Sequence, residues 1–303
     1  MSLSVPQEEL EVLAGLLSPS DPMARRPSPL LVSKLSGRGC SIEQSGVADF
    51  YLRDVSIELW QDYLDWSLAR GPLLNQIDIH IYRQTASTQD IAKQLGTEPA
   101  VVIADQQTAG RGRLGRQWQS ESGSCVLMSI RWPKSLLDIT HDRLSLISGL
   151  VVARITERLL PESRVRMKWP NDVMVDGRKI AGILIETTSN AFIIGIGLNV
   201  CSTPTLSSES NGATSLREAG SQIHRLAVIE SILIDLQLRF GQSLASLEGW
   251  QPLAAVGTIQ TFEQAGQRIT GEVLDLDPDH GLIVRRNTGE ILTLPAATTS
   301  VIK

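Results

Sequence analysis

The order of apolar and polar positions divides the chain into stretches with different patterns. Alternating or short apolar runs predict strands at 77–82, 101–104, 125–132, 165–169, 173–175, 180–186 and 191–200. Apolar stripes at helical spacing predict helices at 142–160 and 224–247. Ser87 begins a shorter helix that runs to Leu95, because its hydroxyl can cap the first backbone N–H groups. Strands interleaved with helices indicate an α/β (α+β) fold.

The two ends of the chain differ from this central stretch. Helices are expected at 8–17 and 59–68, and between them the proline-rich residues 18–29 block regular structure. After Trp250, strands at 268–277, 281–286 and 290–294 are separated by turns, which favours a small β-barrel. With Gly71-Pro72 as a boundary, we expect three domains, at 1–72, 73–252 and 253–303.

Composition narrows the class of protein. A chain of 303 residues with 42% hydrophobic and 20% charged residues is long enough for a full core, and its net charge of −5 gives no reason to expect a nucleic-acid binder. Three distant cysteines lack metal-ligand spacing and fit free thiols in a reducing cytoplasm. Neither a secretory signal nor a membrane-length apolar run is found, so we expect a cytoplasmic protein.

A segment of unusual composition runs from Gly110 to Trp118, with three arginines, three glycines and no acid. Glycines let a backbone approach a ligand closely, and arginines offer fixed donors to phosphate and carboxylate oxygens. Trp118 could stack on a purine or cover a site. The segment therefore predicts an anion-binding loop, although a flexible basic loop or a nucleic-acid patch has the same composition.

Three other segments carry candidate chemistry. Lys168-Trp-Pro-Asn-Asp172 could hold a lysine where a carboxylate attacks a phosphate, with Asp172 orienting it; the alternative is a hairpin with a surface lysine. Strands 179–186 and 194–199 contain interior glycines, which indicate close approach of a ligand or only tight packing. Asn199 ends an apolar run and needs a buried partner. Ser87-Thr-Gln presents polar groups at a helix start, which can also be plain capping.

Four motifs, taken together and in chain order, resemble the signature motifs of biotin protein ligases: Gly110 to Trp118, Lys168 to Asp172, Gly182-Ile-Leu-Ile-Glu186 and Gly195-Ile-Gly-Leu-Asn199. The resemblance spans residues 75–303. The resemblance implies a mixed-sheet catalytic domain followed by a small SH3-like barrel. It also implies a reaction in two steps, in which ATP and biotin give biotinyl-5′-AMP and pyrophosphate, and a lysine of a biotin carboxyl carrier protein then takes the biotin. Mg²⁺ would arrive with ATP, and no dedicated metal site is expected. Members often pair through their central sheets, so the resemblance allows a homodimer.

By the same resemblance each motif receives a role. Lys168 is the expected catalytic residue, with Arg111 and Arg113 assisting. Arg116, Trp118, Lys179 and Asn199 are expected on the nucleotide side. The residues expected around biotin are Ser87, Thr88, Gln89, Gln107, Gly110, Arg111, Gly112, Arg113, Lys168, Gly182, Gly195 and Gly197.

The chain departs from the family pattern at both ends. Residues 30–65 resemble the end of a winged helix-turn-helix domain, but the part that should supply a recognition helix looks missing. Residues 1–70 carry six Lys/Arg against ten Asp/Glu, a balance of −4 that is unfavourable for DNA, although Arg25 to Arg38 is locally basic. We expect a degenerate domain rather than a repressor. Pro295 to Ser300 replaces a family Gly-Glu turn, which weakens the expectation of nucleotide contacts there.

Other functions remain open at this point. A lipoate ligase or octanoyl transferase shares the fold and the chemical class, while the Gly-Arg-rich loop and Lys168-Trp-Pro-Asn-Asp172 favour biotin. A biotin-sensing DNA-binding regulator with weak ligase activity belongs to a different class and needs a recognition helix. A pseudo-enzyme is disfavoured by the intact set of motifs.

Overall fold

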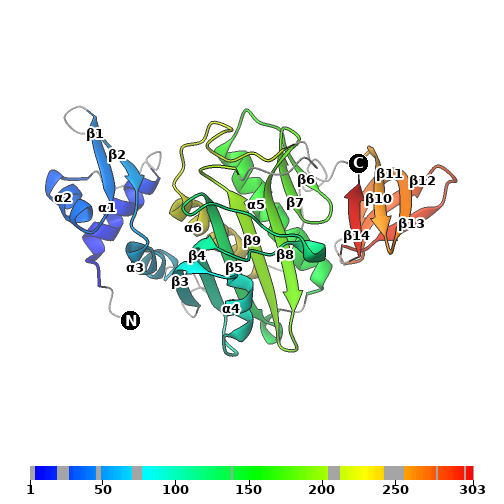
Figure 1. Ribbon diagram of the computed structural model, residues 1–303, viewed down its shortest axis with the longest axis horizontal. Helices are drawn as coiled ribbons and strands as arrows, with labels where there is room; N and C mark the ends of the chain where they lie inside the picture. The colour runs from blue at the N-terminus through cyan, green and yellow to red at the C-terminus, as the bar shows by residue number, and fades with distance from the viewer. Residues whose placement is uncertain are drawn as a thin grey trace.

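The computed structural model describes residues 4–18, 27–45, 49–69, 77–137, 139–203, 212–241, 256–277, 279–296 and 298–302. Three units follow one another along the long axis of the molecule (Figure 1). A helical N-terminal unit with a small hairpin lies at one end, the largest sheet is central, and a β-sheet unit lies at the other end.

Helices and one hairpin make up the N-terminal unit: α1 (Gln7–Leu17), α2 (Pro29–Gly37), β1 (Ser41–Ser45), β2 (Asp49–Asp54) and α3 (Glu58–Leu68). Helix α2 is not predicted by the sequence pattern, which left Leu30 onward as short apolar pieces. It forms because proline is tolerated in a first helical turn and the Ser28 side chain accepts a hydrogen bond from Leu31 N. Residues 19–26 of the proline-rich stretch and the Gly71-Pro72 boundary lie outside the described residues.

Seven strands form the central sheet in the order β3-β4-β5-β9-β8-β7-β6. Strands β3 and β4 are parallel and all other neighbours are antiparallel, so the sheet is mixed, as expected. The parallel pair is joined through α4 (Thr88–Gln94), the crossover that parallel strands need. The strands are β3 (Asp78–Thr85), β4 (Ala100–Gln107), β5 (Cys125–Pro133), β6 (Val165–Lys168), β7 (Asp172–Val175), β8 (Arg178–Thr187) and β9 (Ala191–Asn199).

Different elements cover the two faces of this sheet. Helices α5 (His141–Leu159) and α6 (Arg225–Gly241) pack on the face that carries the main hydrophobic core. On the opposite face, α4 packs through Ala92 against Val102 and Ile193. Because side chains alternate along a strand, Gly195 and Gly197 share the face of Ile193. Residues 242–247, the predicted end of the last long helix, lie outside the described residues.

An antiparallel five-stranded sheet forms the C-terminal unit, in the order β13-β12-β11-β10-β14. The mixed α/β fold with an all-β C-terminal unit is thus confirmed, while β10 and β14 are strands that the sequence pattern did not predict. The unit meets the start of α5, where Asp142 Oδ2 accepts a hydrogen bond from Ala296 N at 2.9 Å. Its strands are β10 (Ile259–Gln264), β11 (Gln267–Asp277), β12 (Gly281–Arg286), β13 (Ile291–Leu294) and β14 (Thr299–Ile302).

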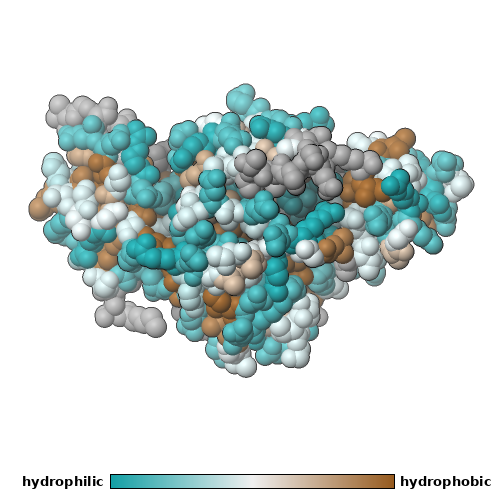
Figure 2. Space-filling view, viewed as in Figure 1, coloured by the Kyte–Doolittle hydropathy of each residue, from teal (hydrophilic) through white to brown (hydrophobic). Residues whose placement is uncertain are grey.

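Hydrophilic residues cover most of the face seen in Figure 2, and hydrophobic residues form separate patches over all three units. The longest helix within the described ranges, α5, has 19 residues and carries several charges, among them Arg154 and Glu157. Neither it nor any other described helix combines the length and the apolarity of a membrane-spanning segment.

Trp60 of α3 joins the N-terminal unit to the central unit. Its side chain is 1% exposed, and the Cζ of Arg225 lies 5.0 Å from the centroid of its ring. The same guanidinium donates to Asp105 Oδ1 at 2.7 Å, so the indole covers a largely buried ion pair. Beside it, Tyr63 Oη donates to Glu230 Oε2 at 2.8 Å. The N-terminal unit is therefore packed on the central unit, at α6 and β4, by buried contacts.

We expect Trp60→Ala to lower the free energy of unfolding by about 3–5 kcal/mol, because it opens a cavity above this ion pair. The measurement is urea denaturation followed by circular dichroism. Leu30→Ala, which truncates a side chain that is 67% exposed, serves as the control and should change stability by about 0.5 kcal/mol or less. Equal losses in the two variants would contradict the packing role of Trp60.

Candidate active site

The arginine-rich loop between β4 and β5 folds back on itself over the sheet face that carries α4. Gly112 N donates to Arg116 O at 2.8 Å, and Trp118 N donates to Gly110 O at 2.9 Å. Glycine is required at 110, because an added Cβ would lie 2.5 Å from the carbonyl oxygen of Trp118. We call residues 108–124 the β4–β5 loop.

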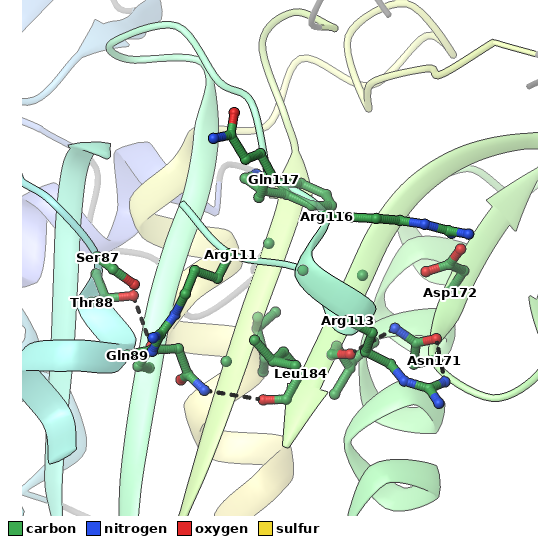
Figure 3. Close-up of a pocket in the computed structure, with 18 of the residues that line it drawn as sticks. Ser87, Thr88, Gln89, Arg111, Arg113, Arg116, Gln117, Asn171, Asp172 and Leu184 are labelled. Atoms are coloured by element: carbon green, nitrogen blue, oxygen red, sulfur yellow. Dashed lines mark hydrogen bonds between the residues drawn. The ribbon is translucent and has the colours of Figure 1, made fainter. Parts of the chain in front are cut away.

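A cavity lies between the β4–β5 loop, the start of α4 and the strands β8 and β9 (Figure 3). Motifs far apart in the sequence therefore meet around one space. The predicted residues that line it are Ser87, Thr88, Gln89, Gln107, Arg111, Gly112, Arg113, Arg116, Trp118, Lys179, Gly182, Gly195 and Gly197. The predicted residues that do not line it are Gly110, Lys168 and Asn199.

The first turn of α4 supplies the buried, polar end of the cavity. Ser87, Thr88 and Gln89 are all less than 5% exposed. The backbone N and the hydroxyl of Thr88 both donate to Gln107 Oε1, at 2.7 and 3.0 Å, which fixes the Gln107 amide. No described residue, however, provides a hydrogen-bond partner for Ser87 Oγ or Gln89 Oε1. Buried polar atoms without partners are rare in folded proteins, so these two atoms indicate where a polar ligand binds.

The glycines of β8 and β9 make room for protein side chains at the cavity wall. An added Cβ at Gly197 would lie 2.5 Å from the Trp118 ring, and one at Gly182 would lie 3.1 Å from it. At Gly195 the neighbour is Gln89 Oε1, at 2.9 Å. The sequence pattern left open whether these glycines mark close approach of a ligand or tight packing, and the resemblance placed them around biotin. The structure shows instead that the glycines seat Trp118 and Gln89, which in turn border the cavity.

Arg113 and Arg116 lie on the opposite side of the cavity, whereas Arg111 lies on the α4 side (Figure 3). Arg113 donates to Asn171 Oδ1 at 3.2 Å and to the carbonyl oxygens of Ala296 and Thr299 at 2.7 and 3.2 Å. Burial lowers the pKa of the Arg113 guanidinium from its ordinary value, against the raising effect of the nearby Asp172 carboxylate. An arginine remains charged at neutral pH after such a shift. This side of the cavity is therefore suited to anionic groups.

Lys179, and not Lys168, is the lysine that faces this space. Its Nζ lies 2.7 Å from Asp172 Oδ1 and 5.5 Å from the centroid of the Trp118 ring. In a regular strand, residue 180 would share the cavity face with Gly182, and Lys179 would point to the opposite face. A shift of register between β7 and β8 pairs Lys179 with Met174 and turns its side chain to the face of Asp172 and the glycine.

Lys168 does not line the cavity, and the catalytic role that the resemblance implies for it stays a prediction. Lys168 ends the edge strand β6 and is paired with Asp172 of β7, so β7 separates Lys168 from β8. The Lys168-Trp-Pro-Asn-Asp172 motif is easily recognised in the sequence, whereas no sequence pattern marks the bulge that turns Lys179 toward the cavity.

Asn199 also lies away from the cavity lining. Its side chain is 2% exposed, its Nδ2 donates to Thr214 O at 3.0 Å, and its Oδ1 accepts from Cys125 Sγ at 3.4 Å. Its amide is therefore committed to holding the segment after β9 against β5, and the expected nucleotide contact is not one that the cavity offers.

The cavity also has lining residues that were not predicted as site residues, and the polar ones among them include Ser129, Asn171 and Ser300. The Lys168-Trp-Pro-Asn-Asp172 motif already contained a signal for Asn171. Ser300 had no signal, since only the packing of the C-terminal sheet brings it to the site. Within the described ranges, no cluster of three or more His, Cys, Asp or Glu side chains could hold a metal ion.

Comparison with known proteins agrees with this geometry. The model of the biotin/lipoate A/B protein ligase family matches residues 81–200. The bifunctional ligase/repressor BirA of Bacillus subtilis is 31% identical over 224 residues, which cover 67% of this chain and 68% of that protein. A biotin–[acetyl-CoA-carboxylase] ligase of Mycobacterium tuberculosis is 30% identical over 230 residues, 70% of this chain and 84% of that protein.

Among solved structures, the biotin protein ligase of Aquifex aeolicus in complex with biotin and ATP superposes with a TM-score of 0.64 at 25% identity, covering 75% of this chain and 99% of that one. The range matched by the family model contains the motifs from α4, the β4–β5 loop, β8 and β9 that surround the cavity. The chain therefore belongs to the biotin protein ligase family.

Proposed function

We propose that this protein uses ATP to convert biotin to biotinyl-5′-AMP and then transfers the biotin to a lysine of a biotin carboxyl carrier protein. The observation that carries the proposal is one cavity with two unlike ends. Unpaired polar atoms lie at the buried end, and cationic side chains lie at the other. Biotin has the same division, with a polar ureido ring at one end and a carboxylate at the other.

The buried end offers what a ureido group needs. Such a group has two N–H donors and one carbonyl acceptor. Gln89 Oε1 can accept an N–H, and the Ser87 hydroxyl can donate to the carbonyl. Both protein atoms lack a partner among the described residues, so binding the ring would satisfy them. The valeryl chain would then run past Trp118 toward the cations.

The cationic end fits the first chemical step. The biotin carboxylate attacks the α-phosphorus of ATP, a new oxygen–phosphorus bond forms, and pyrophosphate leaves. Two anions must approach each other, and negative charge builds up on the phosphoryl oxygens. Lys179 and Arg113 line the space where these groups would meet, and fixed cations lower the energy of such a transition state. We assign the main catalytic role to Lys179, with Arg113 assisting and Arg116 serving the nucleotide. Arg111, which is paired with Asp90 and Glu186 beside α4, is assigned to the biotin end.

The second step needs no nucleophile from this protein. The carrier lysine attacks the acyl carbon of the mixed anhydride, and AMP leaves. Until the carrier arrives, the anhydride must be kept from water. The β4–β5 loop covers the cavity with Trp118 and with side chains that bind across it to Asn171 and Glu186, which suits exclusion of solvent.

Mg²⁺ would enter with the nucleotide. The carboxylate of Asp172 at the cavity is the group that could contact such an ion, and it is now paired with Lys179. When bound, the ion would neutralise phosphate charge. Because the described residues form no metal cluster of their own, the protein supplies cations mainly through its lysine and arginines.

Product mass tests the proposed function. We expect incubation with ATP, biotin and a carrier domain to add one biotinyl group to one carrier lysine, as read by mass spectrometry of the modified peptide. Parallel reactions with lipoate or octanoate should give no adduct. A lipoyl or octanoyl adduct without a biotinyl adduct would assign the protein to the lipoate branch of the matched family.

Substitution of the two lysines separates the competing assignments. Lys179→Ala should slow pyrophosphate release by about 10²–10³-fold, the loss typical of removing one group that stabilises transition-state charge. Lys168→Ala should cost less than about tenfold by the same reasoning, because its side chain is one strand removed from β8. The reverse ranking in a pyrophosphate assay would return the catalytic role to Lys168.

We also propose that the N-terminal unit does not act as a DNA-binding repressor. Helix α2 directly precedes the β1–β2 hairpin, where a winged-helix domain would read DNA. Its basic side chains are occupied, however: Lys34 Nζ lies 3.1 Å from Glu8 Oε1, and Arg38 Nε donates to the buried Glu9 at 2.6 Å. The pair with the buried Glu9 holds Arg38, whereas the exposed Lys34–Glu8 pair is weak, so the proposal rests mainly on Arg38 and on the balance of −4 over residues 1–70.

A gel shift with DNA from upstream of the protein's own gene and of biotin-synthesis genes tests this second proposal. With biotin and ATP present, we expect no complex tighter than non-specific binding, roughly 10⁻⁶ M at physiological salt. Unrelated DNA of the same length is the control. A retarded complex that forms only with the upstream DNA would refute the proposal.

A further inference from the structure

The half-buried carboxylate of Glu186 links three segments of the site, namely β8, α4 and the β4–β5 loop. It lies near the end of β8, and its oxygens accept from Lys93 Nζ at 2.7 Å, Gln89 Nε2 at 2.8 Å and Arg111 at 3.0 Å. Lys93 and Gln89 come from α4, whereas Arg111 comes from the β4–β5 loop and also pairs with Asp90 at 2.8 Å. Glu186 is not among the residues that line the main cavity.

These contacts fix which way the Gln89 amide points. Its Nε2 is surrounded by acceptors: the Glu186 carboxylate at 2.8 Å and, at 3.5 Å each, the carbonyl oxygens of Leu184 and Ile193 (Figure 3 shows the bond to Leu184). An ionised carboxylate can only accept hydrogen bonds, so the amide nitrogen must face it. Gln89 Oε1 is therefore turned toward Gly195, buried and without a partner among the described residues.

Glu186 is ionised at neutral pH and can keep this orientation. Burial acts to raise the pKa of its carboxyl, but hydrogen bonds from Lys93 and Gln89 and the charge of Arg111 bring the pKa below its ordinary value. Two cations and one amide thus compete for two oxygens, and the amide has the most buried position of the three donors, since Gln89 is 4% exposed.

We propose that Glu186 is a positioning and specificity-determining residue, which by orienting the Gln89 carbonyl into the cavity selects a ring that carries an N–H donor. The inference rests on the proposed function, in which that ring is the ureido ring of biotin. A dithiolane or an alkyl chain has no N–H and would leave Gln89 Oε1 buried and unsatisfied. Sites that present a buried hydrogen-bonding group reject analogues that lack the matching group far more strongly than apolar pockets reject size variants.

Steady-state kinetics of the full-length protein test the inference. Glu186→Leu removes both carboxylate oxygens and leaves the Gln89 amide nitrogen only the two backbone carbonyl oxygens at 3.5 Å, so the amide is held less firmly and can rotate. We expect the KM for biotin to rise about tenfold or more, the effect of losing one well-formed hydrogen bond in a buried site. The KM for ATP should stay within about twofold, because Glu186 contacts none of the side chains at the cationic end, Lys179, Arg113 and Arg116. Inhibition by lipoate, a ring acid without an N–H, should strengthen relative to that by biotin analogues.

A double-variant cycle shows whether Glu186 acts through Gln89. If it does, Glu186→Leu in a Gln89→Leu background should add little to the loss caused by Gln89→Leu alone. Additive losses would overturn the inference. Glu186→Gln keeps the shape of the side chain and one acceptor oxygen, so it should fall between the wild type and Glu186→Leu and guards against misfolding of the leucine variant.

Lys93→Met is the matched control, since it removes one partner of Glu186 without touching Gln89 or the cavity. Its KM for biotin should stay within about twofold of the wild-type value, because the half-buried ion pair is lost while the bond between Gln89 and Glu186 remains. A rise equal to that of Glu186→Leu would mean that charge balance on α4, and not amide orientation, sets biotin affinity. Absence of biotinylation by the wild type would refute the proposed function, whereas an active wild type with unchanged Glu186 variants would refute only this inference.

Discussion

The alternation of side chains along antiparallel strands is the constraint on which the site depends. Once β5, β9 and β8 pair in register, Gly195, Gly197 and Gly182 must share one face, and that face must be the one that α5 and α6 leave uncovered. The β4–β5 loop can then lie flat on it, with Trp118 over two glycines. A slip of one residue would bring isoleucines to this face and exclude the loop.

The fold could be predicted largely from the sequence because its strands are strongly patterned. The long helix α5 and the strands β5, β8 and β9 follow from periodicity alone. Helix α2 was missed because prolines usually interrupt helices, and here Pro29 occupies the first turn, where it is tolerated. Strands β10 and β14 were missed because their alternation is weak and their pairing with each other is a long-range contact.

The sequence motifs predict most of the residues that line the cavity. They do not predict which lysine faces the cavity, because that depends on one bulged residue in β8. Most of the expected residues do surround the cavity, because a cluster of glycines and arginines identifies the β4–β5 loop even when its conformation is not known. The choice between Lys168 and Lys179 depends on a bulge, which moves a side chain to the other face without any clear sequence signal. The same holds for Glu186, whose three partners come from α4 and from the β4–β5 loop and meet only in the folded chain.

The bond between Arg113 and Ala296 has a consequence for synthesis of the protein. The two residues are 183 positions apart, and Ser300 from the same C-terminal strand region lines the cavity. A ribosome therefore releases the arginine-rich loop long before the carbonyl groups that hold it exist. During that interval the central sheet can be folded while its cavity is open on one side, so the order of synthesis delays a competent active site until the C-terminal sheet has formed.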